Sequence, residues 1–408
     1  MDFIAPIKYG KNNNKISRRP LQSTPIKILD APGIEDDFYL NLLDWEHKSN
    51  RVSVLLGGSD VYFWNATNLT QIDDTISDQS AISSLGRQSP INSDSGCVIK
   101  WSPAGSKLAI GTKNGFVEIW DAERSVRLHN WIGHVGTRCG VLSWAPSGSY
   151  EGHLSSGGRD HRVVHYDIRT ARGIISSTYT GHTQEVCGLK YDHYGKNYES
   201  WYIFLICSVG SGLLASGGND NQLLVWDRRR DQTGPLLELN QHVAAVKAID
   251  WSPHQAGLLA SGGGTADRTI RFWNTKLPIS ANINGDNSNY ASFKPIQASS
   301  QVCTLAWSPL SPGEILSTHG FSEHNLALWS YPTGNCLGTL DGHSQRVLFQ
   351  AMGPDGSTVV TGSGDETLRF WSVFRRPTAG GGNQLQNRTR NGRNPVDGAL
   401  ESIFQSSR

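Results

Sequence analysis

The chain has 408 residues, a formal net charge of +1 and 18% charged residues. A chain this close to neutral is not built to neutralise many phosphates, so nucleic acid is not an expected partner. No stretch approaches the roughly 20 apolar residues that a membrane helix needs. The N-terminus also lacks an apolar signal core, so we expect neither membrane insertion nor secretion.

The cysteines are scattered along the chain without a CxxC pair, which excludes a zinc ribbon and a redox dithiol. They are Cys97, Cys139, Cys187, Cys207, Cys303 and Cys336. We therefore expect reduced, buried thiols in a protein of the nucleus and cytoplasm, with no metal and no cofactor.

Residues 1–24 are rich in Asn, Arg and Ser and lack apolar periodicity, which predicts a flexible N-terminal tail. Residues 375–408 have the same character, with added Gly, and predict a flexible C-terminal tail. Between them, residues 25–374 carry a repeat.

Tryptophans mark this repeat, and eleven of the thirteen are in frame. One set ends a short apolar alternation every 42 to 60 residues: Trp64, Trp120, Trp226, Trp273, Trp329 and Trp371, with Tyr166 filling one place. A second set ends the strand that opens each unit: Trp45, Trp101, Trp144, Trp251 and Trp307, with Tyr191 filling one place. Only Trp131 and Trp201 fall outside the frame. Because the spacing follows the repeat, we expect the others to be core residues.

Each unit also carries turn residues at fixed offsets. Gly-His pairs, as at Gly133-His134 and Gly181-His182, come before the first strand, and Trp-Asp pairs such as Trp226-Asp227 end the third. These offsets are typical of WD repeats, which form four-stranded blades. We expect the histidines to bond within blades, for example His182 to Asp220. The sequence thus predicts an all-β, seven-bladed WD-repeat β-propeller.

A propeller must close its ring. No good strand follows Trp371, so the last blade would lack its outer strand. We expect residues 26–29, before the first blade, to supply it, because closure removes an open sheet edge.

Three segments interrupt the regular pattern. Ser80 to Ser95 and Pro278 to Asn289 are predicted loops. The fourth unit holds about a dozen extra residues around Lys196 to Gly210, including the apolar run Trp201 to Cys207. We expect this insertion on the face opposite the Gly-His turns. It is a chance insertion, a gene-model error or a partner-binding loop.

Enzyme chemistry is not indicated. Residues 210–215 match the dinucleotide fingerprint GxGxxA, but they precede a short strand, so no helix N-terminus would hold the phosphate. The chain has no P-loop, HExxH or GxSxG motif. We expect a binding platform rather than an enzyme, although a fold alone names no ligand.

Several strings go beyond a generic WD repeat. They are Lys27–Gly33, Asp36–Trp45, Gln184–Lys190, Ala244–Ile249, Ala260–Trp273 and Gly364–Trp371. They resemble the Fizzy and Fizzy-related family, the co-activators of the anaphase-promoting complex, a ubiquitin ligase. Ser252–Gln255 and Gly264–Arg268 look more like the Fizzy-related branch.

The resemblance implies that the propeller captures degradation motifs of substrates such as cyclins. A KEN-box site would lie on one face of the channel, formed by Asn219, Asn221, Thr265, Gln301 and Arg346. Amides and a hydroxyl suit the peptide's Asn, and Arg346 suits its Glu. A destruction box, Arg-x-x-Leu, would bind between the first and last blades, its Arg meeting Asp44 and Glu366. Those two carboxylates are adjacent only if the ring closes as predicted.

Ligase docking is less well matched. The family's C-box string, Asp-Arg-[Phe/Tyr]-Ile-Pro-x-Arg, does not occur in this chain. The resemblance assigns docking to a C-terminal Ile-Arg, of which Arg408 remains while Ser407 replaces Ile. Two alternatives follow. The chain is a monomeric propeller that acts within the large ligase complex, or it is a scaffold that binds degron-like peptides without ligase docking.

Overall fold

The computed structural model describes residues 21–58, 60–67, 69, 82–85, 94–146, 152–170, 175–192, 212–229, 234–276 and 294–375. The chain divides into a unit from Met1 to Arg376 and a segment from Pro377 to Arg408, and the latter lies outside the described residues. The described part of the first unit consists of strands and turns, with no helix.

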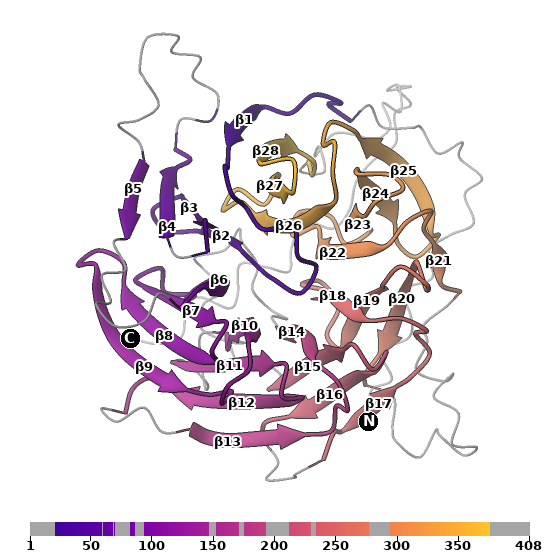
Figure 1. Cartoon of the computed structure of the whole chain (residues 1–408). Helices are drawn as coiled ribbons and strands as arrows, with labels where there is room; N and C mark the ends of the chain where they lie inside the picture. Colours follow the sequence, from indigo (N-terminus) through magenta and orange to yellow (C-terminus); the bar gives the residue numbers. More distant parts are fainter. Residues whose placement is uncertain are drawn as a thin grey trace, which may run out of the picture. The chain divides into compact units, whose positions relative to one another are not determined.

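Seven four-stranded antiparallel sheets form the blades (Figure 1). Blade 1 contains β2 (Leu43–Glu46), β3 (Arg51–Leu56), β4 (Asp60–Asn65) and β5 (Ile82–Leu85). Blade 2 contains β6 (Gly96–Trp101), β7 (Lys107–Thr112), β8 (Phe116–Asp121) and β9 (Val126–Ile132). Blade 3 contains β10 (Cys139–Trp144), β11 (His153–Gly158), β12 (Arg162–Asp167) and β13 (Ile175–Thr180).

The remaining blades follow the same order. Blade 4 contains β14 (Val186–Tyr191), β15 (Leu213–Gly218), β16 (Leu223–Asp227) and β17 (Leu237–Leu239). Blade 5 contains β18 (Val246–Trp251), β19 (Leu258–Gly263), β20 (Thr269–Asn274) and β21 (Ile296–Gln297). Blade 6 contains β22 (Val302–Trp307), β23 (Glu314–His319), β24 (Leu326–Ser330) and β25 (Asn335–Leu340). Blade 7 contains β26 (Val347–Met352), β27 (Thr358–Ser363), β28 (Thr367–Ser372) and β1 (Lys27–Asp30).

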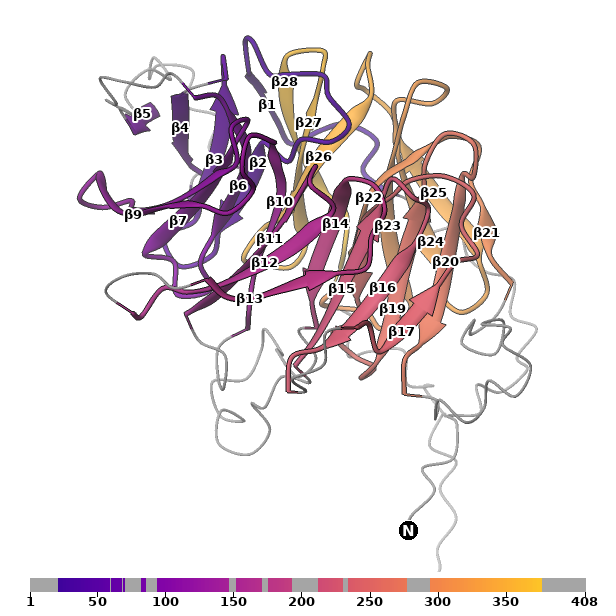
Figure 2. The ribbon, with the colours of Figure 1, turned by 60° about the horizontal axis from the view of Figure 1, so that its bottom comes forward.

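The ring closes as the sequence predicts. Strand β1 pairs antiparallel with β28, with Leu29 opposite Leu368 (Figures 1 and 2). The innermost strands of neighbouring blades contact one another around the whole ring, from β2 through β26 and back to β2. The first and last blades are therefore held together by a strand from before blade 1, which leaves no open edge on β28.

A buried polar chain links strands within blades. In blade 4 the Nδ1 atom of His182 lies 3.1 Å from Asp220, and its Nε2 atom lies 2.8 Å from the hydroxyl of Ser216. The indole nitrogen of Trp226 donates to the same hydroxyl. Blades 3, 5 and 7 have the same arrangement, starting from His134, His242 and His343, with Tyr166 in place of the tryptophan in blade 3 and Thr361 in place of the serine in blade 7. The predicted bond between His182 and Asp220 is thus confirmed, and it ties the Gly-His turn to the turn between the second and third strands.

Most of the in-frame aromatic residues are core residues, as expected, whereas Trp64 and Trp329 are only partly buried. Trp226, Trp273, Trp371 and Tyr166 have at most 1% of their surface exposed. Trp131 falls outside the repeat because it comes from the outer strand β9, where its ring stacks on Tyr166, 5.1 Å between centroids. The tyrosine that replaces a tryptophan in blade 3 is thereby covered by a tryptophan from blade 2.

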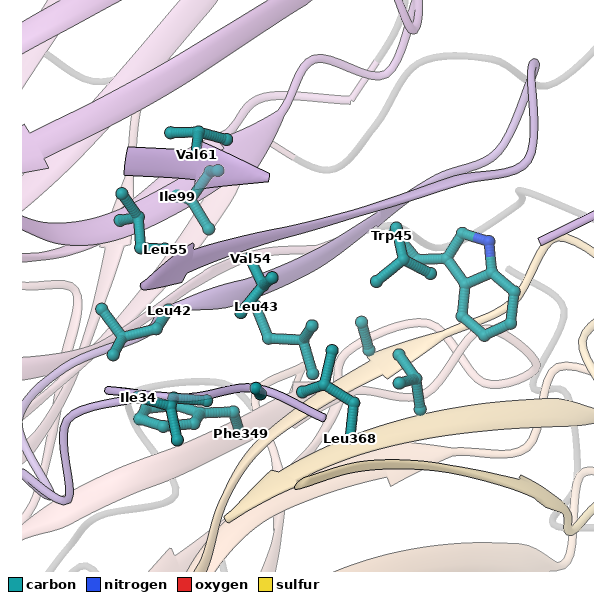
Figure 3. Close-up of a cluster of buried hydrophobic side chains, with 14 of the residues drawn as sticks. Ile34, Leu42, Leu43, Trp45, Val54, Leu55, Val61, Ile99, Phe349 and Leu368 are labelled. Atoms are coloured by element: carbon teal, nitrogen blue, oxygen red, sulfur yellow. The ribbon is translucent and has the colours of Figure 1, made fainter. Parts of the chain in front are cut away.

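The largest apolar cluster joins blades 1, 2 and 7, and Figure 3 shows part of it. It contains Leu55 of blade 1, Ile99 of blade 2 and Phe349 of blade 7. Ile34, from the segment between β1 and β2, belongs to the same cluster. The seam at which the ring closes is therefore an apolar contact as well as a strand pairing.

Two expectations need correction. Strand β5 lies inside the predicted loop Ser80 to Ser95, because four residues of Ile-Ser-Ser-Leu are too short to show periodicity but pair with β4. The described cysteines are free, but Cys336 is exposed rather than buried. Pro278 to Asn289, the insertion at Lys196 to Gly210 and Cys207 lie outside the described residues.

Candidate functional site at one mouth of the channel

The strand register gathers turns from all blades on the same end of the ring. The first strand of a blade begins where its second strand ends, as in the pairs Val186 with Gly218 and Val347 with Ser363. Residues just before a first strand therefore share one end of the channel with turns between second and third strands. We call this end the upper face, and the end where the first strands finish the lower face.

The segment from Ala31 to Leu42, here called the crossing segment, runs from β1 to β2 through the middle of the ring (Figure 1). It begins at blade 7, where the amide of Ala31 donates to the carbonyl of Glu366. It ends at blade 2, where Asn41 forms a parallel bridge with Val98. The chain thus connects the two ends of the ring across the upper part of the channel.

Side chains of the crossing segment bind blades 3 and 4 on the far side. The guanidinium of Arg138 contacts Asp37 at 2.9 Å and both carboxylate oxygens of Glu185 at 2.6 and 2.9 Å. It also lies over the ring of Tyr39, 4.8 Å from the centroid. The hydroxyl of Tyr39 donates to Asn219, 2.9 Å away. Burial, reinforced by the negative charge of Glu185, raises the pKa of Tyr39, which keeps this hydroxyl a donor.

Lys247 of β18 holds the middle of the crossing segment. Its ammonium donates to the carbonyl oxygens of Leu40 (2.9 Å) and Leu348 (3.2 Å). The rings of Phe38 and Phe349 lie 5.3 and 5.4 Å from the same nitrogen. Burial lowers the pKa of Lys247 to about 8. A buried cation with two carbonyls and two aromatic faces is a specific anchor rather than a solvated charge.

The structure places the five residues of the predicted KEN-box site on the upper face. Asn219 and Asn221 lie in the turn after β15, and Asn221 has a left-handed backbone with φ of 65°. Thr265 is exposed in the turn after β19. Gln301 and Arg346 immediately precede β22 and β26. The five residues therefore come from blades 4, 5, 6 and 7 around one mouth of the channel.

These side chains are held in place by neighbours. The amide of Asn219 is oriented at both ends, because it accepts from Tyr39 and donates to Gln184 at 2.8 Å. Gln301 is 8% exposed, and a Cβ placed on Gly320 would lie 3.0 Å from its Oε1 atom. The guanidinium of Arg346 stacks over the exposed ring of Phe321, 4.3 Å from the centroid.

Arg346 is also bonded to the crossing segment. Its Nε donates to the carboxylate of Asp36 at 3.0 Å, and its Nη2 donates to the backbone oxygen of Asp36 at 2.8 Å. Arg346 has 15% of its side chain exposed and Asp36 has 32%. One residue of the predicted KEN-box site is therefore ion-paired within the free protein.

The predicted pairing of Asp44 with Glu366 is not found, although the ring closes. Asp44 faces blade 2, where it accepts from Lys100 at 2.5 Å and from the amide of Trp101 at 2.7 Å. It lines a lower-face cavity of about 310 Å³ together with Pro103 and Pro253. Glu366 lies on the upper face, where it accepts from the amide of Gly33 at 3.1 Å. The predicted pairing fails because Asp44 lies within β2, between Leu43 and Trp45, and lines the lower-face cavity instead of a turn on the upper face.

Asp36 takes the position that was expected for Asp44. A Cβ placed on Gly364 would lie 2.9 Å from the Cβ and Cγ of Asp36, so only glycine fits there. Glu366 is two residues further along the same turn, with a left-handed φ of 59°. The seam between blades 7 and 1 thus presents two carboxylates on the upper face.

Several residues of the candidate site were not predicted from the sequence. Asp36 and Tyr39 lie in the string Asp36–Trp45, which stands out in the sequence only by its family resemblance. No local sequence pattern indicates that this segment crosses the channel. Lys247 did have a signal, because a single lysine interrupts the apolar start of β18. Arg408 and the insertion around Trp201 lie outside the described residues.

The described residues contain neither a membrane-spanning helix nor a cluster of metal ligands. In the part of the chain that the structure describes, no helix is long and apolar enough to cross a membrane. Among the same residues, no group of three or more His, Cys, Asp and Glu side chains is placed to hold a metal ion.

A closed seven-bladed ring, with buried hydrogen-bond chains that run from His to Asp and to a Ser or Thr hydroxyl in four blades, defines a WD-repeat propeller. The model of the CDC20/Fizzy WD40 domain matches residues 29–371, which is most of the chain. The chain therefore belongs to the CDC20/Fizzy family, in agreement with the resemblance seen in the sequence.

Three comparisons place it within that family. The chain is 46% identical to the protein FIZZY-RELATED 3 of Arabidopsis thaliana over 87% of its own length and 63% of that relative. It is 39% identical to the anaphase-promoting complex subunit cdh1 of Dictyostelium discoideum, covering 88% of this chain and 45% of that one. It thus spans less than two thirds of these relatives. A chain in the crystal structure of the mitotic checkpoint complex is 38% identical, with a TM-score of 0.71, covering 92% of this chain and 99% of that one.

Proposed function

We propose that this chain is a substrate-recognition co-activator of the anaphase-promoting complex that binds KEN-box and destruction-box peptides and promotes ubiquitination of cell-cycle proteins such as cyclins. The observation that carries the proposal is the convergence of Asn219, Thr265, Gln301 and Arg346 on one channel mouth. Family membership and the name of the Dictyostelium relative support the choice of ligase.

The upper face suits a short peptide with an Asn and a Glu. Thr265 is exposed and offers a hydroxyl, while Asn219 and Gln301 offer amides that can accept and donate. Arg346 supplies a fixed guanidinium, which can pair with a carboxylate through two parallel hydrogen bonds. Because Phe321 and the backbone of Asp36 hold Arg346 from two sides, little side-chain freedom is lost on binding.

The seam between blades 7 and 1 suits the Arg of a destruction box. We assign its partners as Glu366 and Asp36, in place of the Asp44 expected from the sequence. Both carboxylates lie on the upper face, and Asp36 is 32% exposed at its side chain. Asp44 is already bonded to Lys100 and to a backbone amide, so it offers no equivalent site.

Binding of a labelled KEN-box peptide tests the proposal. We expect micromolar affinity for the wild-type chain and loss of binding in Arg346→Glu, because the peptide's Glu would then face a like charge. Arg124→Glu is the matched control, since Arg124 is exposed in the turn between β8 and β9, and it should bind like wild type. Unchanged binding by a folded Arg346→Glu variant would overturn the site.

The alternative is a scaffold that binds degron-like peptides without activating the ligase. Adding the chain to purified anaphase-promoting complex distinguishes the co-activator from the scaffold. Stimulated ubiquitination of a degron-bearing substrate supports the co-activator. Degron binding without stimulation supports the scaffold, and the same assay with a chain truncated before Arg408 tests its proposed docking role.

Under this proposal the chain is not itself an enzyme. It contributes proximity, by holding a substrate near a ligase that performs the chemistry, and it needs no cofactor. We also propose that it works in the nucleus and cytoplasm, where the reduced cysteines would be stable. A tagged chain confined to another compartment would contradict this localisation.

A further inference from the structure

The ion pair between Arg346 and Asp36 joins the two proposed peptide sites. Arg346 belongs to the KEN-box site, and Asp36 belongs to the destruction-box seam. In the free protein their charged groups are bonded to each other at 3.0 Å. The KEN-box peptide therefore needs the guanidinium of Arg346, which is bonded to Asp36, and the destruction-box peptide needs the carboxylate of Asp36, which is bonded to Arg346.

We propose that this pair couples the two sites, so that a KEN-box peptide and a destruction-box peptide bind with positive cooperativity. The inference rests on the proposed function and deepens it. It names the favoured substrate class as chains that present both motifs at once, rather than either motif alone.

The coupling follows from the change in partners. An incoming Glu competes with Asp36 for the guanidinium of Arg346, and an incoming Arg competes with Arg346 for the carboxylate of Asp36. Whichever peptide binds first separates the pair, and the second then meets a group that is already released. Thermodynamic linkage requires the two effects on affinity to be equal.

The surroundings allow the pair to separate without moving Arg346. Its Nη2 atom also donates to the backbone oxygen of Asp36, at 2.8 Å, and its guanidinium stacks on Phe321. These contacts do not depend on the carboxylate. The Asp36 carboxylate can thus leave Arg346 while the guanidinium stays at the KEN-box site.

Fluorescence polarisation with two separate peptides tests the coupling. A labelled KEN-box peptide is titrated with the chain, alone and with a saturating unlabelled Arg-x-x-Leu peptide, and the experiment is then repeated with the labels exchanged. We expect each affinity to rise by about threefold to fivefold, as for a partly exposed ion pair. Equal affinities with and without the second peptide, or a decrease, would overturn the coupling. If neither peptide binds at all, the proposed function itself fails.

Two charge-removing variants identify the responsible pair. Asp36→Asn should tighten KEN-box binding by about threefold to fivefold and abolish the coupling, because Arg346 is then already released. Asp37→Asn is the matched control. It removes the same charge from the neighbouring residue, whose carboxylate is bonded to Arg138 and not to Arg346. It should keep the coupling. Coupling that persists in Asp36→Asn, or is lost equally in both variants, would overturn the assignment.

Discussion

The ammonium of Lys247 lies 2.9 Å from the carbonyl oxygen of Leu40, on a segment more than 200 residues earlier in the chain. This bond fixes the middle of the crossing segment, whose side chains Asp36 and Tyr39 then reach the upper face. Lys247 thus acts as a positioning residue for the proposed peptide sites, although it is buried within the channel.

Raising the pH should stabilise the fold through Lys247. Burial lowers its pKa in the folded state to about 8, so between pH 8 and 10.5 the unfolded chain binds more protons than the folded one. The free energy of unfolding then rises with pH in this window, by about 3 kcal/mol from this group. Urea unfolding of the wild type and of Lys247→Met at several pH values measures this contribution of Lys247 to the free energy of unfolding.

The relevant quantity is the difference between the unfolding free energies of the two proteins. Burial raises the pKa of Cys97, Cys187 and Cys303 to about 12 in the folded protein, so unfolding also changes their protonation in this pH range. A difference that stays constant from pH 8 to 10.5 would contradict the prediction. Lys113→Met, at a lysine paired on the surface with Glu35, is the control and should retain the wild-type pH dependence.

Removing the hydroxyl of Tyr39 should weaken the KEN-box site alone. In Tyr39→Phe the amide oxygen of Asn219 loses its donor, and the amide can rotate away from its position beside Gln184. We expect about fivefold weaker KEN-box binding, equivalent to about 1 kcal/mol for one hydrogen bond. Destruction-box binding should be unchanged, as should both affinities in Tyr62→Phe in blade 1. Equal weakening of both peptides would point to a general loss of structure.

Breaking the polar chain of blade 4 should destabilise the fold. Asp220 is 3% exposed at its side chain and accepts from His182 and from the amide of Thr183. Asp220→Ala leaves the Nδ1 atom of the buried His182 ring without its partner, at a cost of about 2 to 3 kcal/mol. Denaturant unfolding should show this loss, whereas Asp60→Ala at an exposed position of blade 1 should change stability by less than about 0.5 kcal/mol. Equal midpoints for the two variants would contradict the structural role.

Opening the ring should cause self-association. Leu29 lies opposite Leu368 in the pairing of β1 with β28, and Leu29→Pro removes an amide from that pairing. The exposed edge of β28 would then accept a strand from another chain. Light scattering during size-exclusion chromatography should detect larger species, which Gln22→Pro, outside β1, should not form. A variant that stays monomeric and fully stable would show that closure does not depend on β1.

The repeat itself could be predicted from residues alone. Trp226 and His182 stand at offsets set by one blade, so their spacing and their polar partners follow from local geometry. The same reasoning located β1 in blade 7, because β28 needed an outer partner. It also placed Asn219, Thr265, Gln301 and Arg346 on one face, since turns at equivalent offsets share an end of the ring.

The crossing segment could not be predicted in this way, because nothing periodic marks it. Its route depends on contacts such as Asp36 with Arg346 and Tyr39 with Asn219, which join residues 310 and 180 positions apart. Only the closed ring brings these partners within hydrogen-bonding distance. We assign Asp36 rather than Asp44 to the proposed destruction-box site for the same reason, because the position of Asp36 depends on the path of the crossing segment, which sequence spacing does not reveal.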